Sequence, residues 1–331
     1  MFWLFLYSHF YQMNPINFTY SCNRNCNYCF AKGFLKKWPR EMSLKELKAV
    51  FEWFSKQGIK NSIAFSGGEP TFFSKINLAL KMAENYGFKI RIYTNGIFDV
   101  EKINIKSPAI SSFLVNFNSP SEYSSQEIET LYFNLKSIRK ITKNIDFRFN
   151  IISPDISYNY IIDACKKLNI HHVEFAPVFP SILGKNKYIK KENLKNFAKY
   201  ILRFTKDLLK QNIRGQLAEP FPLCFFSEKE RNFLVKNVGL SGICGAGKNY
   251  AITPDLTVLP CVVFAFKERH LNNFKNEKEV IDYYKKPLNK LRWETDLFPE
   301  CKNCLFKKNK QCQGSCLAYK FLQAKNFQTN Y

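Results

Sequence analysis

The chain has 331 residues, a formal net charge of +23 and eleven cysteines. This length allows one main domain with a large hydrophobic core and a smaller second domain. The cysteines cluster at metal-ligand spacings and no secretory signal is recognisable, which indicates a reducing cytoplasm. The apolar run from Met1 to Tyr7 is too short to span a bilayer and lacks a cleavage site, so we expect an extra strand or a start-site extension, and no membrane association.

The positive charge allows an acidic partner but does not identify one. Residues 185–210 carry nine Lys and Arg against two acidic residues, and residues 301–331 carry six Lys against none. Such runs usually form solvated helix faces. An acidic peptide would fit this charge as well as RNA would, and the absence of a recognisable RNA-binding module argues against a nucleic-acid partner.

Three cysteines, Cys22, Cys26 and Cys29, lie in one short loop with the spacing C-x3-C-x2-C, and an aromatic residue, Tyr28, precedes the third. Thiolates at this density hold iron–sulfur clusters or zinc. A 4Fe–4S cube that is held by three cysteines keeps one iron free for a ligand from outside the protein. Zinc loops usually pair C-x2-C with a second distant pair, so zinc is the weaker alternative.

A second motif follows an apolar strand that begins near Ile63. It consists of Gly67, Gly68, Glu69 and Pro70. Glycines let the backbone approach a ligand closely, and the proline fixes the turn that follows. The position of this motif after the cysteine loop makes the pair more specific than either motif alone.

The two motifs together resemble those of the radical S-adenosylmethionine (SAM) superfamily. The resemblance implies that SAM chelates the open iron, and that reduction of the cluster cleaves SAM to methionine and a 5'-deoxyadenosyl radical. It assigns the catalytic cluster to Cys22, Cys26 and Cys29, with Tyr28 as the motif's aromatic. It also implies that the Gly67–Glu69 turn, formed by Gly67, Gly68 and Glu69, binds the methionine amino group of SAM.

Short apolar strands alternate with amphipathic helices from about residue 16 to about residue 210, which is the pattern of βα units. Ser43 and Glu46 form a capping box that predicts a helix through Gln57, and an apolar stripe from Leu194 to Leu208 predicts another. Six βα units predict an α/β fold with a partial (β/α)6 TIM-like barrel, as does the family resemblance. The expected strands are Ile16–Tyr20, Ser62–Phe65, Lys89–Tyr93, Ser112–Asn116, Phe147–Ile151 and Val173–Phe175.

Functional groups of such a barrel lie at the C-terminal ends of its strands, where both motifs are expected. The same rule selects further polar residues that, by analogy, would hold the ribose and carboxylate of SAM. Ordinary strand-end residues that face solvent or cap a helix are the alternative for each. His171 and His172 precede the sixth strand and are expected at the surface. The selected residues are Thr94, Asn95 and Gly96 after strand three, Asn116 and Asn118 around strand four, and Arg148 and Asn150 on strand five.

The composition changes near Asn212, which predicts a barrel domain over 1–211 and a cysteine-rich domain over 212–331. Seven cysteines lie beyond this boundary: Cys224, Cys244, Cys261, Cys301, Cys304, Cys312 and Cys316. The segment between Cys244 and Cys261 predicts a hairpin. This region resembles the SPASM domain, or its reduced twitch form, which holds auxiliary 4Fe–4S clusters. It departs from the family in having Leu256 where glycine is usual, and in having no cysteine after Cys316.

The resemblance leaves two ligand arrangements open. In the arrangement of a full SPASM domain, Cys244, Cys261, Cys316 and Cys224 hold one cluster, while Cys301, Cys304 and Cys312 hold a second with an open or non-cysteine corner. In the twitch arrangement, Cys244, Cys261, Cys301 and Cys304 hold a single cluster. A zinc ribbon formed by the last four cysteines is a further alternative. Cys165 lies on an expected helix and is interpreted as a small buried thiol.

The sequence therefore predicts a radical SAM enzyme that crosslinks, epimerises or oxidises a ribosomally made peptide or a protein side chain. The expected partners are this substrate and an electron donor such as flavodoxin or ferredoxin. A small-molecule dehydrogenase, an RNA-modifying radical enzyme and a non-catalytic iron–sulfur electron carrier are the alternatives. Sulfatase-maturing relatives are disfavoured because Val262 stands where they place an acidic base.

Overall fold

A computed structural model of the chain describes residues 13–61, 63–183 and 185–324. The run from Met1 to Tyr7 and the expected strand start at Ser62 lie outside the described residues. The described strands form one ten-stranded sheet in the order β10-β9-β8-β1-β2-β3-β4-β5-β6-β7. All neighbours from β1 to β7 are parallel, as crossover connections through helices require.

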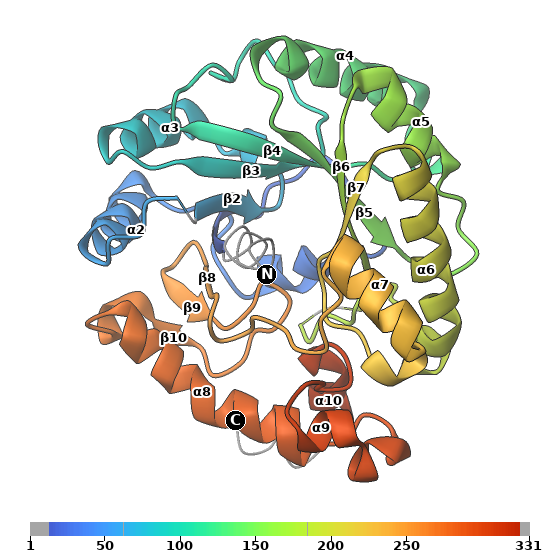
Figure 1. Cartoon of the computed structure of the whole chain (residues 1–331). Coiled ribbons are helices and arrows are strands. Elements are labelled where there is room, and N and C mark those ends of the chain that lie inside the picture. Colours follow the sequence, from blue (N-terminus) through green and yellow to red (C-terminus); the bar gives the residue numbers. More distant parts are fainter. Residues whose placement is uncertain (1–12, 62, 184, 325–331) are drawn as a thin grey trace.

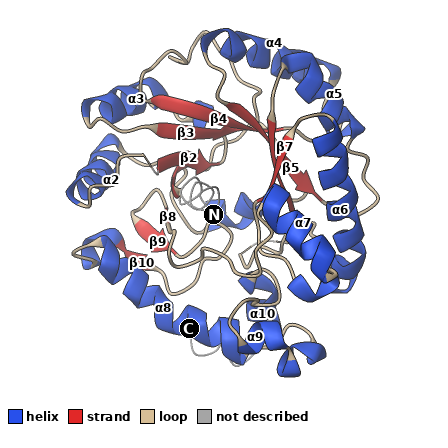
Figure 2. Ribbon diagram, in the orientation of Figure 1, coloured by secondary structure: helices blue, strands red, loops and turns tan. Residues whose placement is uncertain are grey.

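The described residues from 14 to 238 confirm the predicted α/β partial barrel, with strands inside and helices outside (Figures 1 and 2). The parallel strands are β1 (Asn14–Thr19), β2 (Ile63–Gly67), β3 (Ile90–Thr94), β4 (Ile110–Asn116), β5 (Ile145–Ile151), β6 (His172–Pro177) and β7 (Arg214–Leu217). The covering helices are α2 (Leu44–Lys56), α3 (Ile76–Asn85), α4 (Ser125–Ile141), α5 (Asn159–Leu168), α6 (Leu194–Lys210) and α7 (Glu228–Val238). Short 3-10 helices are η1 (Phe30–Lys36), η2 (Pro70–Phe72), η3 (Pro120–Glu122), η4 (Lys191–Asn193) and η5 (Leu223–Phe225).

Local sequence signals account for several of these boundaries. The side chain of Ser43 accepts the backbone N–H of Glu46 and the carboxylate of Glu46 accepts the N–H of Ser43, so the predicted capping box begins α2. Ser124 with Glu127 begins α4 in the same way. Helix α6 buries one apolar stripe against the barrel, as its helical spacing predicts.

Two features of the barrel differ from a strict repeat of βα units. The described segment 95–109, between β3 and β4, contains no helix. The buried side chain of Asn134 on α4 instead donates to the carbonyls of Gly96 and Phe98, and so holds this connection against the barrel. Strand β7 follows the expected domain boundary at 211/212 and pairs with β6, so the sheet continues past that boundary.

The C-terminal region closes against the same sheet. The predicted hairpin forms from β8 (Ala251–Ile252) and β9 (Thr257–Leu259), and β8 pairs with β1 through Ile252 and Ile16. The remaining elements are β10 (Arg269–His270), η6 (Leu271–Asn273), α8 (Glu277–Glu294), η7 (Pro299–Asn303), α9 (Leu305–Lys308) and α10 (Leu317–Gln323). One large buried cluster includes residues of both the barrel and this region.

Leu256, in the turn of this hairpin, has a φ of 64°, which lies in the left-handed region. Glycine reaches this conformation without a steric penalty, whereas a side chain costs roughly 1–2 kcal/mol. This backbone geometry explains why glycine is usual at this position in the SPASM domains that the region resembles. Leu256 is itself buried, so apolar packing offsets part of the backbone cost.

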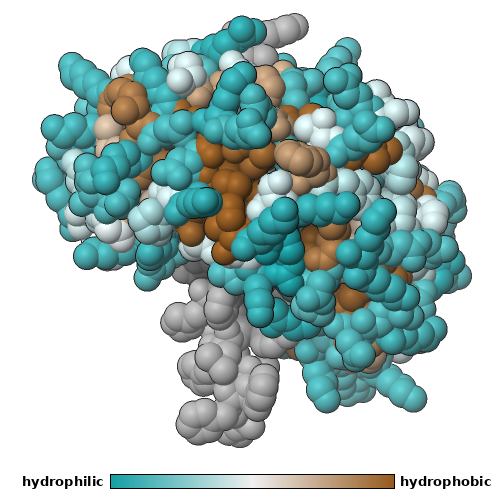
Figure 3. Space-filling view, turned by 90° about the horizontal axis from the view of Figure 1, so that it is seen from above, coloured by the Kyte–Doolittle hydropathy of each residue, from teal (hydrophilic) through white to brown (hydrophobic). Residues whose placement is uncertain are grey.

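The face in Figure 3 is mostly hydrophilic, with hydrophobic side chains gathered near its centre. Among the described residues, no helix is long and apolar enough to cross a membrane.

Candidate active site

The loop after β1 places Cys22, Cys26 and Cys29 at the C-terminal edge of the sheet. Cys22 is exposed, and Cys26 and Cys29 are partly buried. The sulfur of Cys22 accepts the backbone N–H of Arg24 at 3.4 Å. Burial raises the pKa of the Cys22 thiol to about 11, and the nearby charges of Glu69, Cys29 and Cys26 raise it further. The N–H of Cys29 donates to the carbonyl of Cys26 at 3.1 Å, and this turn keeps both residues in the same short loop as Cys22.

The turn after β2 packs backbone to backbone against this cysteine loop. Gly67 has a φ of 123°, and a Cβ atom on it would lie 2.1 Å from the carbonyl oxygen of Thr19. A Cβ on Gly68 would lie 2.3 Å from the carbonyl oxygen of Ser21. The N–H groups of Gly68 and Glu69 donate to those carbonyls at 2.7 and 2.8 Å. The two glycines are thus required for contact between the motifs, in addition to the SAM contact that the sequence predicts.

Glu69 links the ends of two strands through a buried carboxylate. Its Oε1 accepts the hydroxyl of Thr71 at 2.8 Å and that of Thr94 at 2.7 Å, and its Oε2 accepts the N–H of Asn95 at 2.6 Å. Burial raises the pKa of Glu69, while these hydrogen bonds favour its ionised form. Glu69 thereby positions the predicted residues Thr94 and Asn95 beside the cysteine loop.

Asn95 and Asn118 contact the cysteine loop from β3 and β4. The amide of Asn95 donates to the side chain of Asn23 at 2.8 Å and lies 3.9 Å from the sulfur of Cys22. The amide of Asn118 donates to the hydroxyl of Tyr28, while its own carbonyl oxygen is buried without a hydrogen-bond partner in the described structure. Buried polar atoms usually have partners, so this oxygen fits a group donated by a bound molecule.

A network of charges lies inside the barrel. Arg91 on β3 contacts Asp146 at 2.6 Å and Glu174 at 2.8 Å, and Arg148 on β5 contacts Glu174 at 3.5 Å. Arg148 also lies 3.9 Å from Glu219, which follows β7. This row of alternating charges lines the barrel interior.

Further polar residues extend this network. The Nε of Arg148 donates to Asn150 at 3.2 Å, and the amide of Asn150 donates to Asn116 at 3.1 Å. The expectation that His172 lies at the surface is wrong: it is the first residue of β6, only 9% exposed, and 3.1 Å from Asp146. Its place opposite the carboxylate is set by the pairing of β5 with β6, which a single sequence does not show.

The structure brings the sequence-predicted residues of the barrel into two connected groups. Glu69, Asn95 and Asn118 lie around the cysteine loop and its Tyr28, while Arg148, Asn150 and Asn116 line the interior. Arg91, Glu174 and Glu219 are interior charges that the sequence did not single out. Among the described residues, no group of three or more His, Cys, Asp or Glu side chains is arranged to hold a single metal ion. The cluster ligands therefore stay predictions.

A second group of thiols borders the barrel. Burial raises the pKa of Cys261 to about 12 and that of Cys316 well above its usual value, and nearby Glu219 and Cys244 raise both further. The side chain of Gln313 donates to the sulfur of Cys244 at 3.3 Å. The charge of Glu219 therefore acts on Cys261 and Cys316, and Glu219 also lies 3.9 Å from Arg148 inside the barrel.

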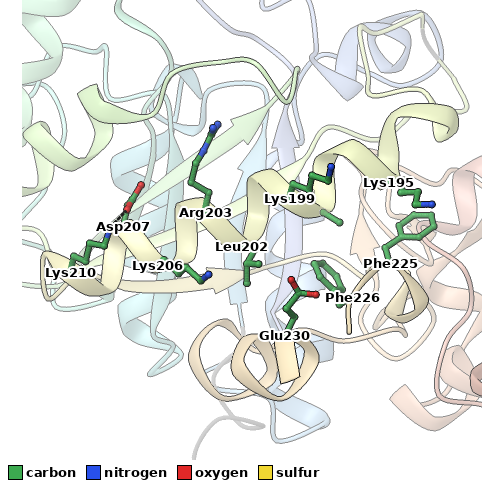
Figure 4. A pocket seen from close by; sticks show the side chains of 11 residues that line it. Lys195, Lys199, Leu202, Arg203, Lys206, Asp207, Lys210, Phe225, Phe226 and Glu230 are labelled. Carbon is green, nitrogen blue, oxygen red and sulfur yellow. Dashed lines mark hydrogen bonds and ion pairs between the residues drawn. The ribbon is translucent and has the colours of Figure 1, made fainter. Parts of the chain in front are cut away.

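A basic groove runs along the outer side of α6. Figure 4 shows Lys195, Lys199, Arg203 and Lys206 on this helix, with Phe225 and Phe226 nearby. The groove has a volume of about 330 Å³. Its acidic members have protein partners, since Asp207 binds the hydroxyl of Tyr158 and the ammonium of Lys210, and Glu230 caps α7. In the described parts of the chain, the four basic residues make no ion pair.

Comparison with known proteins identifies the barrel. Residues 16–174 match the model of the radical SAM superfamily. This segment is a radical SAM domain. Its cofactors are SAM and a 4Fe–4S cluster, and the three thiols of the loop, the close backbone cradle of Gly67 and Gly68, and the unpaired oxygen of Asn118 fit that pair. The radical SAM domain contains both sequence motifs.

Similar proteins differ in what they act on. A 7,8-dihydro-6-hydroxymethylpterin dimethyltransferase of Methanocaldococcus jannaschii is 33% identical over 113 residues, which are 32% of this chain and 22% of that protein. The chain thus spans about a fifth of this curated relative.

Two solved structures show the same fold. SuiB of Streptococcus suis, bound to its precursor peptide SuiA, has a TM-score of 0.66 at 18% identity, covering 95% of this chain and 74% of that one. The protein anSMEcpe, bound to AdoMet and the Cp18Cys peptide, has a TM-score of 0.63 at 18% identity, covering 92% of this chain and 88% of that one.

Proposed function

We propose that this radical SAM enzyme modifies a side chain or backbone carbon of a ribosomally made peptide or a protein. When bound, SAM and the cluster supply a 5'-deoxyadenosyl radical, which removes a hydrogen atom from an unactivated carbon. Cys22, Cys26 and Cys29 would ligate the cluster. Glu69 would hold Asn95 and the Gly67–Glu69 turn in place around SAM.

The position of Glu219 carries this proposal. Its carboxylate lies 3.9 Å from Arg148 inside the barrel, and its charge raises the pKa values of the buried Cys261 and Cys316 thiols. A substrate radical formed in the barrel would therefore be near a thiol group suited to an auxiliary cluster. Crosslinking and oxidation both require removal of an electron after hydrogen abstraction, and an adjacent cluster can accept it. Two structures of this fold were solved with a peptide bound, which supports a peptide as the substrate class.

The basic groove on α6 supports an acidic segment in that substrate. Lys195, Lys199, Arg203 and Lys206 supply positive charge, and Phe225 and Phe226 supply apolar surface. A peptide that alternates acidic and apolar side chains would complement both. Attraction of this kind brings a substrate to the enzyme and weakens as salt screens the charges.

The test uses reconstituted enzyme, SAM, dithionite and the peptide encoded nearest to the gene for this chain. Mass spectrometry should show loss of two hydrogen atoms for a crosslink or oxidation, or uptake of solvent deuterium for an epimerisation. Modification of a pterin or another small molecule, with no peptide product, would overturn the proposal. The similarity to the pterin dimethyltransferase is the observation that favours this second candidate, a small-molecule substrate.

A further inference from the structure

Cys224 lies on η5. It is far in sequence from Cys301, Cys304 and Cys312, yet close to them in space. The residue is exposed, and partial desolvation raises the pKa of its thiol to about 11. The charges of Cys312, Cys304 and Cys301 raise this pKa further. The ring of Phe225, the residue after Cys224, also packs against the ring of Phe298, three residues before Cys301, with centroids 5.6 Å apart, so η5 lies beside η7.

Hydrogen bonds around Cys312 support the same grouping. Its sulfur accepts the backbone N–H of Gly314 at 3.4 Å and also the N–H of Leu223, the residue before Cys224. Cys301 lies on η7 and Cys304 directly follows this helix, where the N–H of Cys304 donates to the carbonyl of Cys301 at 3.3 Å. A Cβ atom on Gly314 would lie 3.9 Å from the sulfur of Cys301. The backbone of 312–314 therefore joins the η5 cysteine to the η7 pair.

Buried positive charge accompanies this group. Lys320 on α10 is 1% exposed, and its ammonium donates to the carbonyl of Arg292 at 2.6 Å. Burial lowers the pKa of this ammonium to about 8, while nearby Cys301 and Cys312 favour its charged form. A cube with four thiolate ligands is anionic, and a buried lysine beside it would partly balance that charge.

We propose that Cys224, Cys301, Cys304 and Cys312 are the four ligands of one auxiliary 4Fe–4S cluster. Four thiolates are the usual complete ligand set of such a cube. Cys224 would supply the fourth thiolate beside Cys301, Cys304 and Cys312. This division differs from the full SPASM arrangement because it removes Cys224 from the group of Cys244. It differs from the twitch arrangement because it separates Cys301 and Cys304 from Cys244 and Cys261.

The complementary group then consists of Cys244, Cys261 and Cys316, with the carboxylate of Glu219 beside it. The charge of Glu219 raises the pKa of both Cys261 and Cys316. A second cluster held here would have three thiolate ligands and one corner next to Glu219 and the barrel interior.

Protection of Cys224 from alkylation tests the assignment in the full, cluster-loaded chain. N-ethylmaleimide should not label Cys224 in the loaded wild type. Changing Cys301, Cys304 and Cys312 together to Ser should expose Cys224 to labelling, whereas changing Cys244, Cys261 and Cys316 to Ser should leave it protected. The opposite pattern, or labelling of Cys224 in fully loaded wild type, would overturn the proposal.

Iron content gives a second readout, which does not depend on enzyme activity. Cys224→Ala should remove about four iron atoms per chain, one cube, whereas the matched control Cys165→Ala should remove none. Added to the Cys301, Cys304 and Cys312 variant, Cys224→Ala should cause no further loss. A further loss of about four irons in that background would place Cys224 with Cys244 instead. The assignment assumes only that the C-terminal cysteines hold clusters, and no peptide is used, so it can fail independently of the proposed function.

Discussion

The carboxylate of Glu69 accepts the backbone N–H of Asn95 at 2.6 Å, which joins the turn after β2 to the turn after β3. The same side chain accepts the hydroxyl of Thr94 through its other oxygen. Because Asn95 in turn holds Asn23 of the cysteine loop, one buried carboxylate organises three strand ends. The predicted SAM contact at Glu69 and this structural role are compatible, since the turn must be rigid to hold a ligand.

Glu69→Gln should weaken SAM binding by about tenfold, because a carboxamide cannot accept all the hydrogen bonds that the carboxylate receives, and a lost bond to a charged group costs about 1.5–3 kcal/mol. Calorimetric titration of SAM into loaded protein measures this. The control is Glu52→Gln on the exposed face of α2, which should bind SAM normally. Unchanged SAM affinity in Glu69→Gln would contradict the role given to this carboxylate.

Gly67→Ala should destabilise the protein and reduce cluster loading, because the new Cβ would collide with the Thr19 carbonyl. Gly58→Ala is the matched control, since Gly58 also has a positive φ of 70° but no atom within 4 Å of its added Cβ. The control should lose about 1 kcal/mol of unfolding free energy, and Gly67→Ala clearly more. Equal losses of unfolding free energy in the two variants, measured by urea unfolding, would show that close packing between the two motifs contributes nothing to stability.

Arg148→Met should cost about 3 kcal/mol of unfolding free energy, near the lower end for breaking a buried ion pair, because Glu174 would lose one of its cationic partners. Lys102→Met, which breaks an exposed pair with Asp99, should change stability by less than about 1 kcal/mol. Denaturant unfolding of both variants separates the two cases. A loss in Arg148→Met no larger than in Lys102→Met would argue against a connected interior network.

Reversing the charge of Lys199, Arg203 and Lys206 to Glu should reduce the affinity for an acidic peptide and make binding less sensitive to salt. Reversing Lys136 and Lys140 on α4 is the control, and should have little effect. Fluorescence anisotropy at increasing salt measures both. Transfer RNA that binds tightly and selectively at physiological salt would favour the RNA-modifying alternative instead.

The sequence predicts those parts of the site that depend on neighbouring residues. The loop of Cys22, Cys26 and Cys29 and the Gly67–Glu69 turn are continuous motifs, and parallel strand order places both at one edge of the sheet. The capping box at Ser43 predicts the start of α2 because its two hydrogen bonds join residues three apart. The hairpin before Cys261 is predicted for the same local reason.

Contacts between distant segments are what the sequence does not predict. Cys224 is 77 residues before Cys301 in the numbering, and only the packing of η5 against 312–314 brings them together. His172 is buried and lies beside Asp146 because β6 pairs with β5. Arg91 and Glu174 meet across the barrel interior, and alternating polar residues on separate strands do not reveal which charges will pair.

Cleavage of SAM is the most direct measurement of the central claim, that the Cys22, Cys26 and Cys29 loop holds the radical cluster. Anaerobically reconstituted protein that is reduced with dithionite should convert SAM to 5'-deoxyadenosine. Changing the three cysteines to Ala should abolish this product while the iron of the C-terminal cysteines remains. Formation of 5'-deoxyadenosine at the wild-type rate by that triple variant would contradict the account.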